Sequence, residues 1–245
     1  MGFRDDLVQS SKERSSRIIV SLDITGPPEM RVDRALGLVR SIDGELAGVK
    51  FHWHLLLPGG LKGLKPLIGF CNDRKIPVLA DIKLNDIEST NLEAVGLLYD
   101  AGVDAIIANP FVGAEEGLSG VIARAKELGR GVVLLVYMSH AGAGEGYGLT
   151  VAGEPLYREF ARRTRDWDAD GAIVSAKSHQ VIREVRSLLK RDQFILCPGV
   201  GVQGGKADRD VIEAGADFVI IGRSVVDAVD PRATLRAFNA SMPAP

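Results

Sequence analysis

The chain has 245 residues, of which 46% are hydrophobic and 25% charged, a composition typical of a folded soluble domain rather than a disordered chain. Its 30 Lys and Arg residues and 32 Asp and Glu residues give a formal net charge of −2. A surface that binds nucleic acid needs an excess of basic residues, so we expect no nucleic-acid partner. The apolar run 132–138 is far shorter than the roughly 18 residues of a membrane helix, and the N-terminus lacks the apolar core of a secretory signal, which predicts a cytoplasmic protein with no membrane partner.

Eight short apolar runs predict strands, at 17–23, 47–51, 77–82, 105–109, 132–138, 171–175, 194–197 and 218–221. Most are continuous rather than alternating, which is typical of parallel strands buried on both faces. Amphipathic segments between them predict helices at 31–42, 88–101, 115–128, 154–165, 180–189 and 206–214. Eight β–α alternations in about 240 residues predict an α/β fold, a (β/α)8 TIM barrel. Because no linker or composition break interrupts the chain, we expect a single domain over 1–245.

Glycine is over-represented, with 28 residues in 245, or about 11% where roughly 7% is usual. Two helix-to-strand connections, 100–104 and 213–217, place Gly102 and Gly215 where a left-handed C-cap is expected. The first strand is not followed by the Gly-x-Gly-x-x-Gly of a doubly wound dinucleotide fold. The remaining clusters follow later strands, where tight turns or a ligand close to the backbone would require glycine.

A barrel of this kind carries its active site at the C-terminal ends of its strands. Asp81 and Lys83 follow the buried third strand at a spacing that directs both side chains to the same side. Buried charges are costly unless paired, so one interpretation is a structural ion pair that closes the barrel mouth. However, Asp23 and Lys50 end the two preceding strands, and a row of alternating acids and bases at a barrel mouth favours a catalytic site.

A second candidate site follows the seventh and eighth strands. Residues 198–205 read Pro-Gly-Val-Gly-Val-Gln-Gly-Gly, and residues 221–224 read Ile-Gly-Arg-Ser. Loops at these two places in TIM barrels often bind phosphate through backbone N–H groups. Glycine permits the close approach of the backbone, and Arg223 adds a planar, permanent positive charge. The two loops together predict a phosphorylated ligand.

Histidines offer a rival interpretation as a metal site. His52 and His54 lie at strand spacing, and His140 and His179 fall near the ends of the fifth and sixth strands. Metal-dependent barrel hydrolases with such a pair also need a carboxylate at the end of the eighth strand, where this chain has Gly222 and Arg223. We therefore expect no metal, and we expect ordinary imidazoles, with His140 as a candidate for the cleft wall.

Taken together, these residues resemble the orotidine 5′-phosphate decarboxylase family. The resemblance rests on Asp-Ile-Lys-Leu-Asn-Asp-Ile at 81–87, Leu-Asp at 22–23, Gly-Val-Lys at 48–50 and the two glycine loops, and it covers essentially the whole chain. Residues 137–142 are similar to the family's loop over the pyrimidine, whereas the glycine-rich run 142–148 departs from it and implies an unusually flexible lid. The Asp-x-Lys-x-x-Asp pattern alone also fits metal-dependent sugar-phosphate enzymes of the wider superfamily. Lys50 favours the decarboxylase branch, because the metal-dependent members carry an acid there.

The resemblance implies a cofactor-independent loss of CO2 from orotidine monophosphate, which yields uridine monophosphate in the last step of its de novo synthesis. Lys83 would stabilise the C6 carbanion and donate the proton, Asp81 would lie near the departing carboxylate, and Ser139 would read the pyrimidine edge. The implied catalytic residues are Lys50, Asp81, Lys83 and Asp86. The implied substrate-binding residues are Asp23, Lys50, Thr90, Ser139, Pro198, Gly199, Val200, Gly201, Gln203, Gly204, Gly205, Gly222 and Arg223.

The resemblance also implies a homodimer in which Asp86 and Thr90 reach into the neighbouring subunit's site. A barrel that binds a phosphorylated metabolite without catalysis is the alternative from a different functional class. Ligand binding without turnover would distinguish it from the enzyme.

Overall fold

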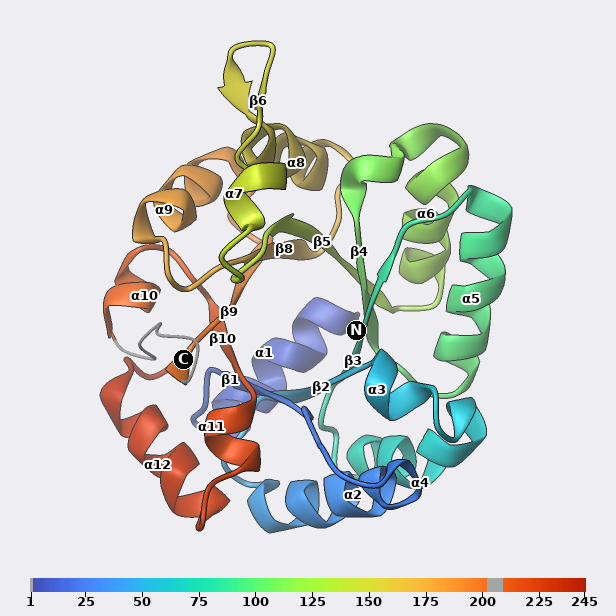
Figure 1. The fold of residues 1–245 in the computed structure, drawn as a ribbon, viewed down its shortest axis with the longest axis vertical. Helices are drawn as coiled ribbons and strands as arrows, with labels where there is room; N and C mark the ends of the chain where they lie inside the picture. The colour runs from blue at the N-terminus through green and yellow to red at the C-terminus, as the bar shows by residue number, and fades with distance from the viewer. Residues whose placement is uncertain (1, 202–208) are drawn as a thin grey trace.

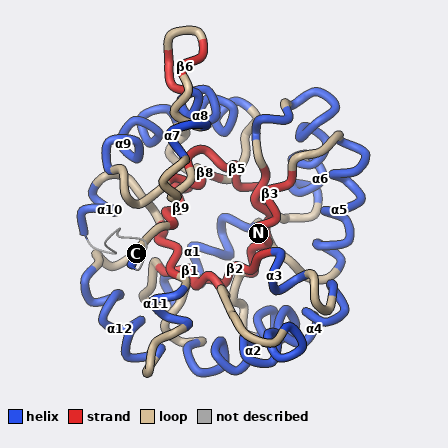
Figure 2. The backbone as a smooth tube through the Cα atoms, viewed as in Figure 1, coloured by secondary structure: helices blue, strands red, loops and turns tan. Residues whose placement is uncertain are grey.

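The computed structural model describes residues 2–201 and 209–245. Within them, eight parallel strands close into a barrel in the order β1-β10-β9-β8-β5-β4-β3-β2 (Figures 1 and 2). Their bounds are β1 (Ile18–Ser21), β2 (Gly48–His52), β3 (Val78–Leu84), β4 (Ala105–Ala108), β5 (Gly131–Tyr137), β8 (Gly171–Val174), β9 (Phe194–Pro198) and β10 (Phe218–Ile221). The predicted TIM barrel is confirmed, and the predicted strand ends differ from these by about two residues at most.

Each barrel strand is followed by a helix on the outside of the barrel (Figure 1). These helices are α2 (Arg31–Ile42), α4 (Gly60–Asp73), α5 (Glu88–Asp100), α6 (Ser119–Glu127), α8 (Leu156–Asp166), α9 (His179–Leu188), α10 (Arg209–Glu213) and α12 (Pro231–Ser241). Shorter elements are η1 (Pro28–Met30), α3 (Trp53–Leu56), η2 (Pro110–Val112), η3 (Ala114–Leu118), α7 (Ala143–Gly146), α11 (Arg223–Val226) and the hairpin β6 (Thr150–Val151) and β7 (Glu154–Pro155). No helix among the described residues is long and apolar enough to cross a membrane.

Two predicted helices begin later than expected. The segment from 115 first forms the π-turn η3, because Glu116 adopts a left-handed φ of 52°, and α6 starts only at Ser119. The segment from 154 first pairs with β6, and Pro155 then caps α8. Of the helix expected at 206–214, only α10 lies within the described residues.

Helix α1 (Phe3–Glu13) crosses the N-terminal end of the barrel (Figure 1). Phe3 and Leu7 are fully buried and belong to the apolar cluster that fills the barrel interior. A Cβ atom on Gly131, at the start of β5, would overlap the Phe3 ring, so the glycine makes room for the helix. The same interior cluster continues up to Ile107 and Ile220, which form part of the floor of the cavity described below.

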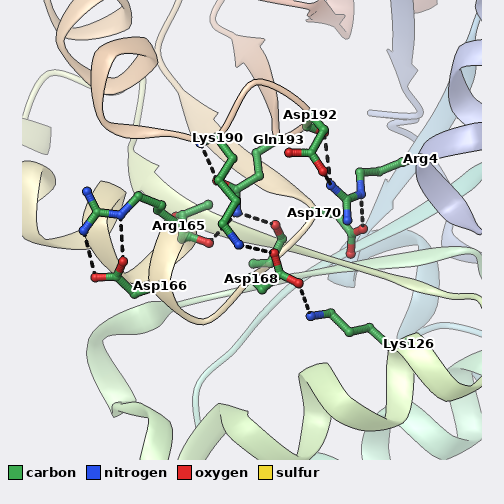
Figure 3. Close-up of polar contacts among 11 residues, drawn as sticks. Arg4, Lys126, Arg165, Asp166, Asp168, Asp170, Lys190, Asp192 and Gln193 are labelled. Atoms are coloured by element: carbon green, nitrogen blue, oxygen red, sulfur yellow. Dashed lines mark hydrogen bonds and ion pairs between the residues drawn. The ribbon is translucent and has the colours of Figure 1, made fainter.

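Carboxylates that are buried or half-buried link neighbouring strands at this N-terminal face. Asp104, Asp170 and Asp217 each precede a strand, and each accepts a hydrogen bond from a backbone N–H near the start of the adjacent strand. The donors are Val78, Val132 and Ile195. Figure 3 shows the surroundings of Asp170. Arg4 forms ion pairs with Asp170 and Asp192, and nearby Asp168 forms ion pairs with Lys126 and Lys190.

The residue two positions before each of these three aspartates has a left-handed backbone conformation. Gly102 and Gly215 have φ of 93° and 117°, as their predicted role at helix ends requires, and Asp168 replaces glycine in the third connection with φ of 57°. Aspartate is among the residues that tolerate this conformation best after glycine. The repeated connection therefore stabilises the face of the barrel opposite to the cavity.

Candidate active site

A cavity of about 440 Å³ lies at the C-terminal ends of the barrel strands. Its floor is apolar, formed by Ile107, Leu135, Ile173 and Ile220. Ten of the predicted site residues line it: Asp23, Lys50, Asp81, Lys83, Ser139, Pro198, Gly199, Val200, Gly222 and Arg223. The segments that the sequence analysis linked to one site therefore come together around one cavity.

The ends of β2 and β3 carry a buried network of charges. Lys50 and Asp81 are only 3% and 7% exposed. One carboxylate oxygen of Asp81 (Oδ2) accepts from Lys50 Nζ at 2.8 Å, and the other (Oδ1) accepts from Lys83 Nζ at 2.9 Å. Asp23 lies close enough to contribute to the electrostatics of Lys50. The predicted acid–base row is thus a compact cluster centred on Asp81.

Lys83 reaches this position through an irregular backbone rather than through regular strand alternation. Its φ is 48°, in the left-handed region, and the pairing of β3 with β4 changes register between Ala80 and Leu84. A bulge of this kind redirects a side chain and is over-represented next to active sites. The left-handed conformation of a residue other than glycine costs about 1–3 kcal/mol and persists only where the surroundings enforce it. The strained backbone at Lys83 therefore lowers the stability of the fold and places the Lys83 side chain on the cavity wall.

Burial and neighbouring charges act in opposite directions on Asp81. Burial by itself would raise the pKa of Asp81, but the adjacent Lys50, His52 and Lys83 outweigh it and hold that pKa well below its usual range. Burial lowers the pKa of Lys50, and the Asp81 carboxylate opposes that effect. Asp81 is therefore ionised at neutral pH.

Backbone turns line the cavity at the ends of β9 and β10. Strands β9 and β3 lie across the barrel from each other, and Pro198, Gly199 and Val200 line the cavity where β9 ends. Gly199 has a left-handed φ of 98°. After β10, a Cβ atom on Gly222 would overlap the Asp23 carboxylate, so only glycine fits there. Arg223 follows directly and lines the same wall. The cavity thus has the glycine turn after β9 across from the charged cluster, and Gly222 with Arg223 beside the Asp23 end of that cluster.

Comparisons with known proteins point to one family. The family model described as "Orotidine 5'-phosphate decarboxylase / HUMPS family" matches residues 16–238. The chain belongs to this family. An orotidine 5′-phosphate decarboxylase of Pyrococcus abyssi is 36% identical over 220 residues, which cover 89% of this chain and 95% of the relative. That of Thermococcus kodakarensis is 35% identical over 224 residues, 90% of this chain and 94% of the relative. The crystal structure of the Pyrococcus horikoshii enzyme superposes with a TM-score of 0.76 at 30% identity, covering 91% of this chain and 98% of that one.

Some of the site residues that the family resemblance implies do not line the cavity of a single chain. Asp86 and Thr90 lie exposed just beyond β3 and at the start of α5. Gly201 lies beside the wall, where a Cβ atom would overlap the Ser224 hydroxyl, but does not line the cavity. Gln203, Gly204 and Gly205 lie outside the described residues. The roles of all six remain predictions.

His52 is the most informative residue that the sequence analysis did not assign to the site. Its ring contacts Lys50 on the same strand, Asp81 on β3 and Asp23 after β1. The spacing from Lys50 (i, i+2) directs both side chains to one side of β2, and that signal could have identified it. The other lining residues that were missed are Ser21, Met138 and Ser224, together with the apolar floor.

The histidines do not gather as a metal site. His140 lines the cavity, as proposed for the cleft wall, but His54 and His179 do not. Across residues 2–201 and 209–245, no group of three or more His, Cys, Asp or Glu side chains is placed to hold a metal ion.

The glycine-rich run at 142–148 includes a short helical turn, α7. Gly148 packs so closely on the carbonyl of Gly144 that a side chain would not fit. Tyr147 anchors the segment, with its ring 6.2 Å from that of Tyr137 and 6.1 Å from that of Phe160. Close packing therefore requires glycine at 148, whereas a Cβ atom on Gly146 would meet no other atom within 4 Å.

Proposed function

We propose that the protein is a cytoplasmic enzyme that decarboxylates orotidine 5′-monophosphate to uridine 5′-monophosphate without a cofactor, within a single domain over 1–245. The observation that carries this proposal is Asp81, held between Lys50 and Lys83 at 2.8 and 2.9 Å on the cavity wall. Relatives named orotidine 5′-phosphate decarboxylase, at 35–36% identity over at least 94% of their length, support it.

The chemistry requires stabilisation of a carbanion at C6 of the pyrimidine, where no adjacent carbonyl can accept the electron pair. Fixed charges aimed at the developing negative charge provide this most effectively, because they need no reorganisation during the reaction. Lys83 suits the role: its ammonium is a donor on the cavity wall, and Asp81 orients it. As the C6–CO2 bond breaks, the electron pair stays on C6 beside Lys83, which then donates a proton to C6.

In this proposal Asp81 is the neighbour of the departing carboxylate. Its low pKa keeps it ionised, so it would repel a substrate carboxylate placed beside it, and this repulsion would be relieved as the carboxylate leaves as neutral CO2. Asp23 and Lys50 hold the ribose hydroxyls and the partners of Lys83 in this proposal.

The phosphate lies at the ends of β9 and β10 in this proposal. Arg223 and the turns at Gly199 and Gly222 provide a planar cation and backbone close to the ligand, and Ser139, after β5, reads the pyrimidine edge. Gln203, Gly204 and Gly205 belong to the same loop in this proposal. Binding energy from the phosphate, remote from the reacting bond, helps to order the site around the base.

The active unit is a homodimer in this proposal, and Asp86 and Thr90 complete the partner's site. Both residues are exposed on the rim beyond β3. Large apolar side chains are exposed on the same side of the barrel, at the ends of β2, β3 and β4: Trp53 is 48%, Ile87 61% and Phe111 68% exposed. Burial of these side chains against a second copy would supply the association energy.

The decisive experiment follows the loss of ultraviolet absorbance of orotidine monophosphate on addition of the purified protein plus EDTA. Turnover that is indifferent to the chelator is expected. Inhibition by EDTA with recovery on adding Mg2+ would favour the metal-dependent sugar-phosphate branch, and binding without turnover would favour a non-catalytic barrel. The Lys83→Ala variant should fold and bind the nucleotide but lose turnover; substantial residual activity would contradict the role of Lys83.

A further inference from the structure

His52 lies inside the charged cluster, at the end of β2. Its Nδ1 atom is 3.2 Å from Asp81 Oδ2. Its Nε2 atom is 2.5 Å from Lys50 Nζ, 3.3 Å from Ser21 Oγ and 3.5 Å from Asp23 Oδ1. The side chain is 25% exposed. Nδ1 therefore faces a carboxylate, and the atom nearest to Nε2 is an ammonium nitrogen.

These contacts determine which nitrogen carries the proton. The Lys50 ammonium has three donors and no acceptor, so the nitrogen that it approaches must offer a lone pair. An ionised carboxylate only accepts, so the nitrogen that faces Asp81 must carry the hydrogen. His52 is therefore neutral, with the proton on Nδ1. Burial, followed by the positive charge of Lys50, lowers the pKa of His52 to about 4, which agrees with a neutral ring at physiological pH.

The two carboxylate oxygens of Asp81 thus contact different partners. Oδ2 accepts from Lys50 and lies 3.2 Å from His52 Nδ1, whereas Oδ1 accepts from Lys83. The two contacts on Oδ2 oppose rotation of the carboxylate about its Cβ–Cγ bond. Since Lys83 is held by the other oxygen of the same group, any rotation would move its ammonium.

We propose that His52 is a positioning residue: it donates from Nδ1–H to Asp81 Oδ2 and thereby fixes the orientation of Asp81 and the position of the Lys83 ammonium. This inference rests on the proposed decarboxylation. His52 does not itself contact the reacting atoms; it acts through Asp81. Its loss therefore reduces kcat more than it raises KM, because its ring contacts the charged cluster rather than Gly199 or Arg223, which hold the phosphate in the proposed function.

Three variants separate the two hydrogen bonds of the ring. In His52→Asn the amide nitrogen can occupy the place of Nδ1 and donate to Asp81, whereas in His52→Gln the terminal amide can occupy the place of Nε2 and accept from Lys50. His52→Ala removes both. A hydrogen bond to a charged group is worth about ten- to hundredfold in an equilibrium or rate, so we expect kcat to fall about ten- to hundredfold in the Ala and Gln variants. The Asn variant should recover most of that loss.

His179→Ala is the matched control, because His179 begins α9 and does not line the cavity. Circular dichroism and thermal unfolding of each variant show that the fold is retained. Wild-type kcat in His52→Ala, or rescue by Gln rather than Asn, would overturn the assignment to Nδ1–H. A rise in KM at constant kcat would instead make His52 a ligand contact and also contradict it.

A second measurement does not depend on activity. In protein labelled with 15N-histidine, the two ring-nitrogen shifts of His52 should report a neutral Nδ1–H tautomer without substrate, and they should not titrate between pH 5 and 8. The groups that face the ring and govern this titration are Lys50, Asp81, Lys83 and Asp23. An Nε2–H tautomer or a cationic ring at neutral pH would refute the inference. If instead the wild-type protein shows no turnover while the tautomer is as expected, the proposed function fails and the geometry of His52 stands.

Discussion

Replacing Asp81 with Asn tests the charged cluster directly, because the change removes one negative charge and keeps the shape of the side chain. Asp81 holds two lysines, but they differ in their access to water. The Lys50 side chain is 4% exposed and that of Lys83 is 34% exposed. Lys83 can turn its ammonium toward solvent, whereas Lys50 cannot. The charge left uncompensated in the variant is therefore that of Lys50.

The magnitude follows from this burial. Removal of one partner from a buried ion pair costs about 3–5 kcal/mol. Because Asp23 remains near Lys50, we expect a loss at the lower end, about 3 kcal/mol. At roughly 2–4 °C per kcal/mol for a chain of this length, Tm should fall by about 6–12 °C.

The loss should also depend on pH. Burial lowers the pKa of Lys50 from 10.5, and Asp81 opposes this lowering, so the Asn variant lowers it further. Between that depressed folded-state pKa and the unfolded value, the unfolded chain binds a proton that the folded chain does not. Stability therefore rises with pH in this window, and the window should extend to lower pH in the variant than in the wild type.

Urea unfolding at neutral and at alkaline pH measures both effects in the wild type, Asp81→Asn, Lys50→Met and the double variant. The double variant lacks both charges, so it should be more stable than the sum of the two single losses implies. Equal stability of Asp81→Asn and the wild type, or strict additivity in the double variant, would refute the argument that the pair is buried and coupled.

Three further predictions concern other parts of the molecule. Arg223→Ala should raise KM about ten- to hundredfold, the worth of a charge-assisted hydrogen bond, with little change in unfolding; an unchanged KM in steady-state assays would remove Arg223 from the phosphate site. Gly222→Ala should push a methyl group against the Asp23 carboxylate and destabilise by about 1–3 kcal/mol, with a loss of turnover, whereas wild-type activity would show that the turn can shift. Phe3→Ala should empty the closed end of the barrel and cost about 3–5 kcal/mol in urea unfolding; a loss below about 1 kcal/mol would indicate that α1 is not part of the core.

The sequence and the structure agree best where a property is local to one segment. The continuous apolar runs identify the barrel strands, because a parallel strand buried on both faces needs apolar side chains throughout. The polar residues that end these runs, such as Asp81 and Lys83, fall at one end of the barrel because all the strands are parallel. Helix α4 escaped prediction since Pro66 and three glycines obscure its apolar pattern, and its packing against α2 and β3 stabilises it instead.

The sequence by itself therefore determined the barrel, the end of it that carries the site, and most of the residues that line the cavity. Only the tertiary structure decided three features: the left-handed backbone of Lys83, the closure of the barrel by Phe3 and Leu7 of α1, and the place of His52 between Lys50, Asp81 and Asp23. Each depends on contacts between segments far apart in the chain. From the sequence, a histidine two positions after a lysine on one strand could be a metal ligand, a surface residue or a positioning group. Only the fold brings Asp81 of β3 and Asp23 after β1 close to the two ring nitrogens of His52.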